Sequence, residues 1–202
     1  MSVMELSAGG LQTARIRLEP LREADREDVR ASGAVKDMWT SMPVIAAGTS
    51  IDAYFSHTLR MAELGIGLGM TARRCEDDAL IGLAAFLLPN RLHRRTRIGY
   101  IWVEPALRGS GLTAHVHFLM LRRALEWRAR RVEWWLSTRN PRAIANVESL
   151  GAVREGLMRQ HSRYADGSWA DLVILSLIND EIRAAMQRLG QSIGELEAAP
   201  DA

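Results

Sequence analysis

The segment at residues 98–113, IGYIWVEPALRGSGLT, decides the fold because it predicts a strand, a tight loop and a helix in immediate succession. Pro105 ends the hydrogen-bonding pattern of a strand, and Gly109 and Gly111 allow backbone angles that other residues avoid. The N–H groups of this loop can converge at the start of the helix, beside the Arg108 guanidinium. Such a site favours an anion, for example a diphosphate. A tight strand-to-helix turn without a ligand explains the same residues equally well.

Outward from this segment, hydrophobic periodicity predicts alternating strands and helices that share one core. No repeat, linker or low-complexity segment divides them. We expect a flexible N-terminus over residues 1–12, one domain over residues 13–180, and a C-terminal helix and tail over residues 181–202. The strands are expected at residues 14–19, 67–73, 79–88, 97–103, 132–137, 153–164 and 168–177, and the helices at residues 21–32, 51–64, 111–129, 141–150 and 179–197.

The composition indicates a globular protein of the cytoplasm. Of the 202 residues, 48% are hydrophobic and 25% are charged, which is close to the average for folded domains. No apolar run reaches the roughly 18 residues that span a bilayer, and residues 1–10 do not resemble a signal peptide, so we expect no membrane partner. Cys75 is the single cysteine, which excludes an internal disulfide and leaves no cysteine cluster. We therefore expect no metal.

A series of spaced motifs gives the chain a resemblance to a known family. Arg108-x-x-Gly111 fits the R/Q-x-x-G-x-G/A signature of the GNAT superfamily of acyl-CoA-dependent N-acyltransferases. The resemblance covers about residues 13–180, and within the family the chain is most similar to the bacterial ribosomal-protein N-terminal acetyltransferases. The other matching residues are Ile98-Gly99-Tyr100, Pro105, Asn140, Leu150-Gly151-Ala152, Glu155-Gly156 and Asp166-Gly167.

The resemblance implies an α/β fold, acetyl-CoA as the cosubstrate and a set of binding residues. The fold would be a single domain with a twisted mixed, mostly antiparallel sheet, flanking helices and a C-terminal helix. The sheet would split between its central strands, where the backbone of Trp102 and Val103 would pair with the pantetheine amides. Asn140 would lie beside the pantetheine or the sulfur, although a plain helix N-cap accounts for it equally well. The diphosphate would lie against Arg108, Gly109, Ser110, Gly111, Leu112 and Thr113.

Several residues depart from the family pattern. Thr113 stands at the last motif position, normally Gly or Ala, where its bulk could crowd the diphosphate or its hydroxyl could bind it. Ala143 stands where the ribosomal-protein branch often has Ser, and Val147 where other branches often have a Tyr that protonates the leaving thiolate. His115 replaces a frequent Glu. The chain therefore lacks both usual acids.

An ammonium acceptor must lose a proton before it attacks, which requires a nearby basic group. Glu104 lies at the mouth of the strand beside the glycine loop and is our candidate for the base. Tyr164, near the last hairpin, and Asn140 complete the predicted catalytic set, although Glu104 could simply cap a loop and Tyr164 could simply pack at a strand end. His115 falls on the polar side of its helix and is expected to be solvated, whereas His117 is expected in the core.

These observations predict an enzyme that transfers acetyl from acetyl-CoA to a primary amine, by direct attack within a ternary complex. The acceptor would be a protein N-terminus, for example of a ribosomal protein, or an amino-acid-like molecule. A small-molecule or toxin-inactivating acetyltransferase and a non-catalytic coenzyme A sensor or scaffold are alternatives. Arginine clusters at residues 91–97 and 128–131 leave an RNA-associated module open. The loops at residues 39–49 and 90–96, which would line the acceptor pocket, carry no readable signal.

An apolar stripe on the C-terminal helix predicts a packing partner. The stripe consists of Ile182, Ala185, Met186 and Leu189, and it is too apolar to remain in water. It would pack on its own domain or on a second copy of the chain, so a homodimer is possible.

Overall fold

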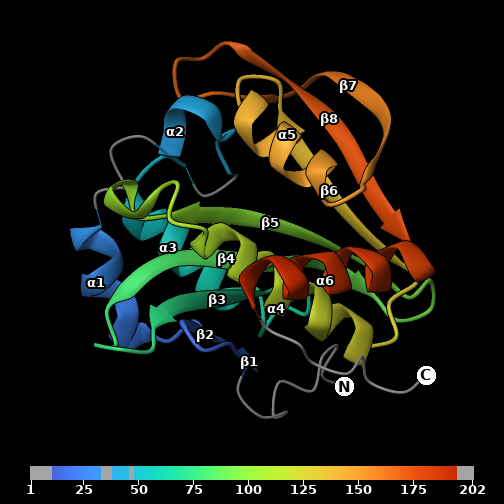
Figure 1. Ribbon diagram of the computed structural model, residues 1–202. Coiled ribbons are helices and arrows are strands. Elements are labelled where there is room, and N and C mark those ends of the chain that lie inside the picture. Colours follow the sequence, from blue (N-terminus) through green and yellow to red (C-terminus); the bar gives the residue numbers. More distant parts are fainter. Residues whose placement is uncertain (1–10, 33–37, 46–47, 195–202) are drawn as a thin grey trace.

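The computed structural model describes residues 11–32, 38–45 and 48–194, and an eight-stranded sheet forms its centre (Figure 1). The strands lie in the order β1-β2-β3-β4-β5-β6-β8-β7, and every neighbouring pair is antiparallel except β5 and β6, which are parallel. The strands are β1 (Leu11–Gln12), β2 (Ile16–Pro20), β3 (Gly67–Arg74), β4 (Leu80–Asn90), β5 (Arg95–Val103), β6 (Arg131–Ser137), β7 (Val153–Arg163) and β8 (Trp169–Ile178). The helices are η1 (Glu23–Asp25), α1 (Arg26–Ala31), α2 (Met38–Ser41), α3 (Ile51–Arg60), η3 (Pro105–Leu107), α4 (Leu112–Glu126), α5 (Pro141–Ser149) and α6 (Asp180–Ile193). The predicted mixed, mostly antiparallel sheet with flanking helices is confirmed.

The N-terminal part of the chain corrects two predictions. Leu11 and Gln12 form β1, which pairs with Leu18 and Arg17 of β2, so the expected flexibility is wrong for these two residues. Leu11 is buried in the core, which supplies the physical reason for this pairing. Residues 1–10 lie outside the described residues. The predicted loop at residues 39–49 contains most of helix α2, whose Met38 is also buried.

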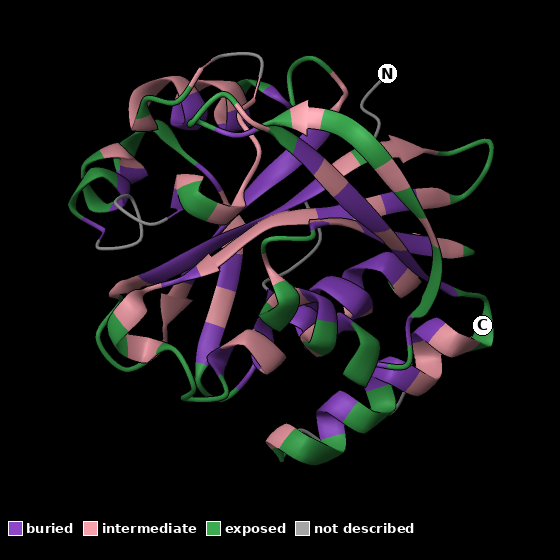
Figure 2. Ribbon diagram, turned by 90° about the horizontal axis from the view of Figure 1, so that it is seen from above, coloured by how far each residue is buried: buried purple, intermediate pink, exposed green. Residues whose placement is uncertain are grey.

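The helices cover both faces of the sheet. The larger hydrophobic core lies between one face and helices α4, α5 and α6, whereas a second core joins the opposite face to α1, α2 and α3. Figure 2 shows that buried residues follow the strands and the inner sides of helices, while exposed residues lie on loops and outer helix faces. At the edge of the sheet where β5 and β6 end, the chain continues into the segments that lead to α4 and α5.

Helix α6 packs on the same domain from which it extends. Ile182, Ala185, Met186 and Leu189 are all buried, and they belong to the larger core together with residues of α4. Helix α6 lies beside α4 (Figure 1). The chain therefore covers its own apolar stripe, which no longer gives a reason for a homodimer. The homodimer stays a prediction.

Replacement of Ile182 by Ala is expected to lower the free energy of unfolding by about 2–5 kcal/mol, because a fully buried side chain would leave a cavity. Denaturant unfolding followed by circular dichroism measures this change. Gln187→Ala, on the exposed side of the same helix, is the matched control and should change stability by no more than about 0.5 kcal/mol. Equal effects of the two variants would contradict the packing of α6 on α4.

Candidate active site

The sheet opens between its two central strands. Strand β5 pairs with β4 as far as Val103, which lies opposite Gly82. On its other side, β5 pairs with β6 only from Arg95 to Arg97. Strand β6 continues to Ser137, but over this part it pairs only with β8, and in Figure 1 it turns away from β5. The split that the resemblance implied is therefore present, and from Ile98 onward one side of β5 has no strand partner within the described part of the chain.

A bulge in β5 sets the direction of the backbone at the split. Tyr100 has a φ of 53°, and the register with β4 shifts between Leu83 and Ala85. Beyond the bulge, the Glu104 N–H donates to the Ile81 carbonyl at 2.8 Å. Successive residues of an antiparallel strand turn their N–H and C=O groups to opposite sides. The backbone groups of Val103 therefore face the split, whereas those of Trp102 face β4.

The carboxyl ends of the parallel strands β5 and β6 lie at one edge of the sheet. Arg97 and Glu133 are the last paired residues of the two strands, and beyond them β5 continues to Val103 and β6 to Ser137. Glu104 and the glycine loop follow β5 directly, and α5 follows β6 after a short connection. The predicted site residues Glu104 and Asn140, 36 positions apart in the sequence, therefore both follow strands that end at this edge of the sheet.

The glycine loop has the geometry of an anion cradle, but with fewer free amides than the sequence suggested. Gly109 and Gly111 have φ values of 85° and 83°. Helix α4 begins at Gly111 without a side-chain cap or an acidic residue in its first turn, so its first N–H groups lack intrahelical partners. The N–H groups of Arg108 and Ser110 instead donate to the carbonyls of Pro105 and Leu107, at 3.2 Å each. These two amides stabilise the turn and are not available to a ligand.

Asn140 acts as the N-cap of α5. Its Oδ1 accepts a hydrogen bond from the Ala143 N–H at 3.0 Å, so the plain-cap explanation describes what this oxygen does. The side-chain NH₂ of Asn140 has no hydrogen-bond partner among the described residues. A cap and a contact to a ligand are therefore compatible at this residue.

Tyr164 belongs to a hydroxyl pair that the sequence did not reveal. Its side chain is 3% exposed, and its hydroxyl is hydrogen-bonded to that of Ser137, the last residue of β6. The Ser137 oxygen also accepts from the Arg139 N–H at 3.0 Å, and the Arg139 guanidinium lies 3.8 Å from the centre of the Tyr164 ring. Ser137 could not be predicted as a site residue, because no motif marks this serine. Only its place at the end of β6 and its contact with Tyr164 distinguish it from other serines.

The two histidines of α4 are both buried. The predicted solvation of His115 is wrong, because the β1–β2 turn covers it and its Nδ1 lies 2.9 Å from the Thr13 hydroxyl oxygen. His117 lies in the core as predicted, where its Nδ1 is 3.0 Å from the Thr113 carbonyl oxygen. Burial lowers the pKa of His117 to about 4, so this ring is neutral near pH 7.

The two arginine clusters meet in the structure. The Arg130 N–H donates to the Arg94 carbonyl at 2.7 Å, which joins the β4–β5 loop to the connection between α4 and β6. Arg131 forms ion pairs with Glu133 and Glu155, and the Arg97 guanidinium lies 3.1 Å from the centre of the Trp135 ring. At least one arginine of each cluster, Arg97 and Arg131, therefore contacts other side chains of the same domain.

Comparison with known proteins identifies the family of this chain. The family model described as Acetyltransferase (GNAT) family matches residues 37–152. The chain belongs to the GNAT acetyltransferase family. As a member of this family, the protein is an acyltransferase.

Solved structures share the fold of this GNAT acetyltransferase. A protein from T. thermophilus, described as an acetyltransferase, is 25% identical, with a TM-score of 0.76 and coverage of 94% of this chain and 100% of that chain. Mycobacterium smegmatis RimJ, in complex with CoA-disulfide, is 18% identical, with a TM-score of 0.73 and coverage of 89% and 90%. Spermidine N-acetyltransferase from Vibrio cholerae, in complex with CoA and spermine, is 16% identical, with a TM-score of 0.68 and coverage of 85% and 99%. No curated protein matches the chain by sequence.

Two further observations concern the described part of the GNAT acetyltransferase. No helix within it is long and apolar enough to cross a membrane. No three His, Cys, Asp or Glu side chains of these residues lie together in a way that could hold a metal ion.

Proposed function

We propose that this GNAT acetyltransferase transfers acetyl from acetyl-CoA to the primary amine of a protein N-terminus or an amino-acid-like acceptor. The observation that supports this most strongly is the juxtaposition of two features at one sheet edge. The uncapped, glycine-rich start of α4 lies directly after β5, and the split between β5 and β6 opens beside it. An anion site next to an opening lined by backbone amides suits a long ligand with a phosphorylated end.

The residues present fit coenzyme A. Both glycines of the loop have left-handed backbone angles, and apart from its chain neighbours no described residue has an atom within 4 Å of a Cβ position on Gly109. The first turn of α4 contains no carboxylate that would repel a phosphate. Two relatives of this fold are described in complex with CoA or its disulfide. The amides of Gly109 and of residues 111–113 would hold the diphosphate, with Arg108 beside them.

The remaining site residues have roles in direct attack. Acetyl-CoA would supply the activated acyl carbon. The Val103 N–H, which faces the split, is the donor for the developing oxyanion, and this orientation favours Val103 over Trp102. Glu104 accepts the proton of the ammonium at the mouth of β5. On the opposite wall, the Ser137–Tyr164 hydroxyl pair can give or take a proton.

The acceptor is expected to be a protein N-terminus, as the resemblance to the ribosomal-protein N-terminal acetyltransferases implies. RimJ has the higher identity and TM-score of the two relatives with bound coenzyme. The spermidine N-acetyltransferase supports the second candidate, a small-molecule amine, on the same fold. The RNA-associated alternative is weaker, because Arg97 and Arg131 are engaged with Trp135, Glu133 and Glu155.

A thiol-release assay tests this proposal. Acetyl-CoA is incubated with the protein and either peptides with free N-termini, free amino acids or polyamines, and the released thiol is measured. We expect the fastest turnover with N-terminal peptides or amino acids. A preference for polyamines or other small amines would select the small-molecule alternative. Stoichiometric binding of coenzyme A without turnover on any amine would indicate a sensor or scaffold.

A further inference from the structure

Arg15 lies against the glycine loop although it is 95 residues away in the sequence. It belongs to the turn between β1 and β2, and its Nη1 donates to the Ser110 carbonyl at 3.1 Å. The same nitrogen lies 4.0 Å from the position that a Cβ on Gly111 would occupy. The guanidinium therefore lies at the start of α4, beside the N–H groups that the proposed function assigns to the diphosphate.

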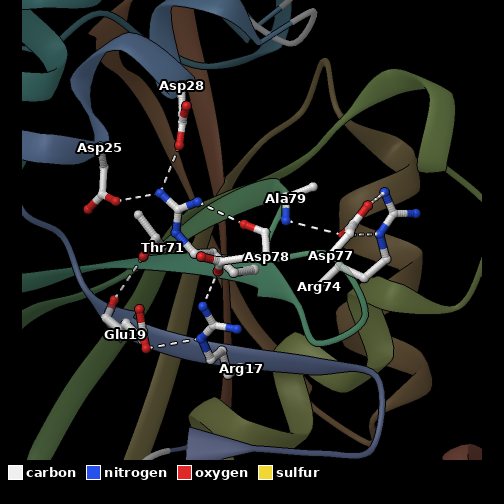
Figure 3. Close-up of polar contacts among 10 residues, drawn as sticks. Arg17, Glu19, Asp25, Asp28, Thr71, Arg74, Asp77, Asp78 and Ala79 are labelled. Carbon is white, nitrogen blue, oxygen red and sulfur yellow. Dashed lines mark hydrogen bonds and ion pairs between the residues drawn. The ribbon is translucent and has the colours of Figure 1, made fainter.

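The charge environment of Arg15 differs from that of the next arginine on the same hairpin. Arg17 forms ion pairs with Glu19 and Asp78 (Figure 3), as expected for a structural arginine. The Arg15 guanidinium has no carboxylate partner among the described residues, and its only hydrogen bond there is to Ser110. A cation at the positive end of a helix is unfavourable by itself. An anion bound at this position would offset both the guanidinium charge and the helix dipole.

The β1–β2 turn is held in place from two sides. The Thr13 hydroxyl oxygen accepts from the Ile16 N–H at 3.2 Å and lies 2.9 Å from Nδ1 of the buried His115. On the other side, the Cys75 N–H donates to the Arg15 carbonyl at 2.9 Å. The backbone of Arg15 is thus fixed, while most of the N–H donors of its side chain remain available. Such preorganisation lowers the entropy cost of binding a ligand.

We propose that Arg15 is a phosphate-binding residue of the coenzyme site, positioned by the Thr13–His115 contact. The inference rests on the proposed function, and it adds to the family loop a contact from the N-terminal hairpin. Its ligand is a phosphate of coenzyme A, either in the diphosphate or at the 3′ position of the ribose. Arg15 binds and orients this group and takes no part in the acyl transfer.

The test measures the dissociation constant of coenzyme A by calorimetry for the wild type and single variants of the full chain. Arg15→Gln is expected to weaken binding by about tenfold to a hundredfold, because a charge-assisted hydrogen bond is lost. Arg15→Lys, which keeps the charge, should recover part of this loss. Arg60→Gln, at the exposed end of α3, is the matched control for loss of an arginine charge and should bind as the wild type does.

Ligand fragments locate the contact. Pantetheine carries no phosphate, so Arg15→Gln and the wild type should bind it equally. If the loss seen with coenzyme A persists with dephospho-CoA, Arg15 contacts the diphosphate; if it disappears, Arg15 contacts the 3′-phosphate. Thr13→Val should also weaken coenzyme A binding, but by less than Arg15→Gln does, because Thr13 only positions Arg15. It should not change the affinity for pantetheine.

Two results would overturn the assignment of Arg15. One is unchanged affinity of Arg15→Gln for coenzyme A while the wild type binds it well. The other is an equal loss of affinity for pantetheine, which would indicate a general disturbance of the site. Absence of coenzyme A binding by the wild type would instead overturn the proposed function. Melting temperatures without ligand establish that each variant is folded.

Discussion

Gly111→Val is expected to abolish coenzyme A binding, whereas the wild type should bind acetyl-CoA with one-to-one stoichiometry. Gly111 has a φ of 83°, a left-handed angle that a β-branched residue adopts only at a cost of about 1–3 kcal/mol. Space is not the main obstacle, since the nearest atom to a Cβ there is the Arg15 Nη1 at 4.0 Å. With valine at position 111, the backbone would shift away from the left-handed φ. The first N–H groups of α4 would then no longer point toward one bound anion.

Thermal unfolding and calorimetry measure this effect together. A ligand that binds only the native state stabilises it by about 2.7 kcal/mol at one hundred times its dissociation constant, so the melting temperature of the wild type should rise with acetyl-CoA. Gly111→Val should show no such rise. Gly167→Val is the matched control, because Gly167 has a φ of 82° in the β7–β8 turn and open space around its Cβ position. It should lose stability but keep the rise.

Two results would contradict this prediction, one with the wild type and one with Gly111→Val. If calorimetry detects no heat of binding at millimolar acetyl-CoA, the wild type does not bind this cosubstrate. The proposed acetyl transfer would then be wrong, although the chain belongs to the family. Retained binding by Gly111→Val would show that the loop amides are not the phosphate site.

Glu104→Gln is expected to lower kcat/KM by about a hundredfold or more, because it keeps the size of the side chain and removes the proposed base. The reason lies in the two protons that the reaction must manage. Near neutral pH most of the acceptor amine is protonated, because its ordinary pKa is about 7.7–8.0 at a protein N-terminus and about 10.4 in an alkyl ammonium, so its nitrogen must lose a proton during the reaction. A thiol has an ordinary pKa of about 8.5 and leaves readily as the thiolate without an acid. A base therefore matters more than an acid for the leaving group, which agrees with the absence of hydroxyls at Ala143 and Val147.

Tyr164→Phe is the comparison for Glu104→Gln and should reduce kcat/KM by less. This variant breaks the hydrogen bond to Ser137 but keeps the ring beneath Arg139. Both variants are assayed across a range of pH by thiol release, and coenzyme A binding by each should match the wild type. Full activity of Glu104→Gln at every pH, together with a large loss in Tyr164→Phe, would assign the proton transfer to the Ser137–Tyr164 pair.

Much of the fold could be predicted because local patterns are sufficient for it. Alternation in residues 132–137 and helical spacing in residues 111–129 predict β6 and α4, since these periods follow from backbone geometry alone. Gly109 and Gly111 predict the loop for the same reason, because their left-handed angles are a property of single residues. Pairing of Leu11 with Leu18 could not be predicted, because two residues form no pattern and only the buried site opposite them selects a strand.

The sequence alone determined the family, the order of most strands and helices, and the glycine loop, all of which depend on residues close together in the chain. The tertiary structure decided which groups share the site. Only folding opens the split between β5 and β6, joins Ser137 to Tyr164, buries His115 under Thr13 and places Arg15 against Ser110. Each of these depends on contacts between distant segments, whose distance and direction are set by the packing of the whole sheet and leave no periodic signal in the sequence.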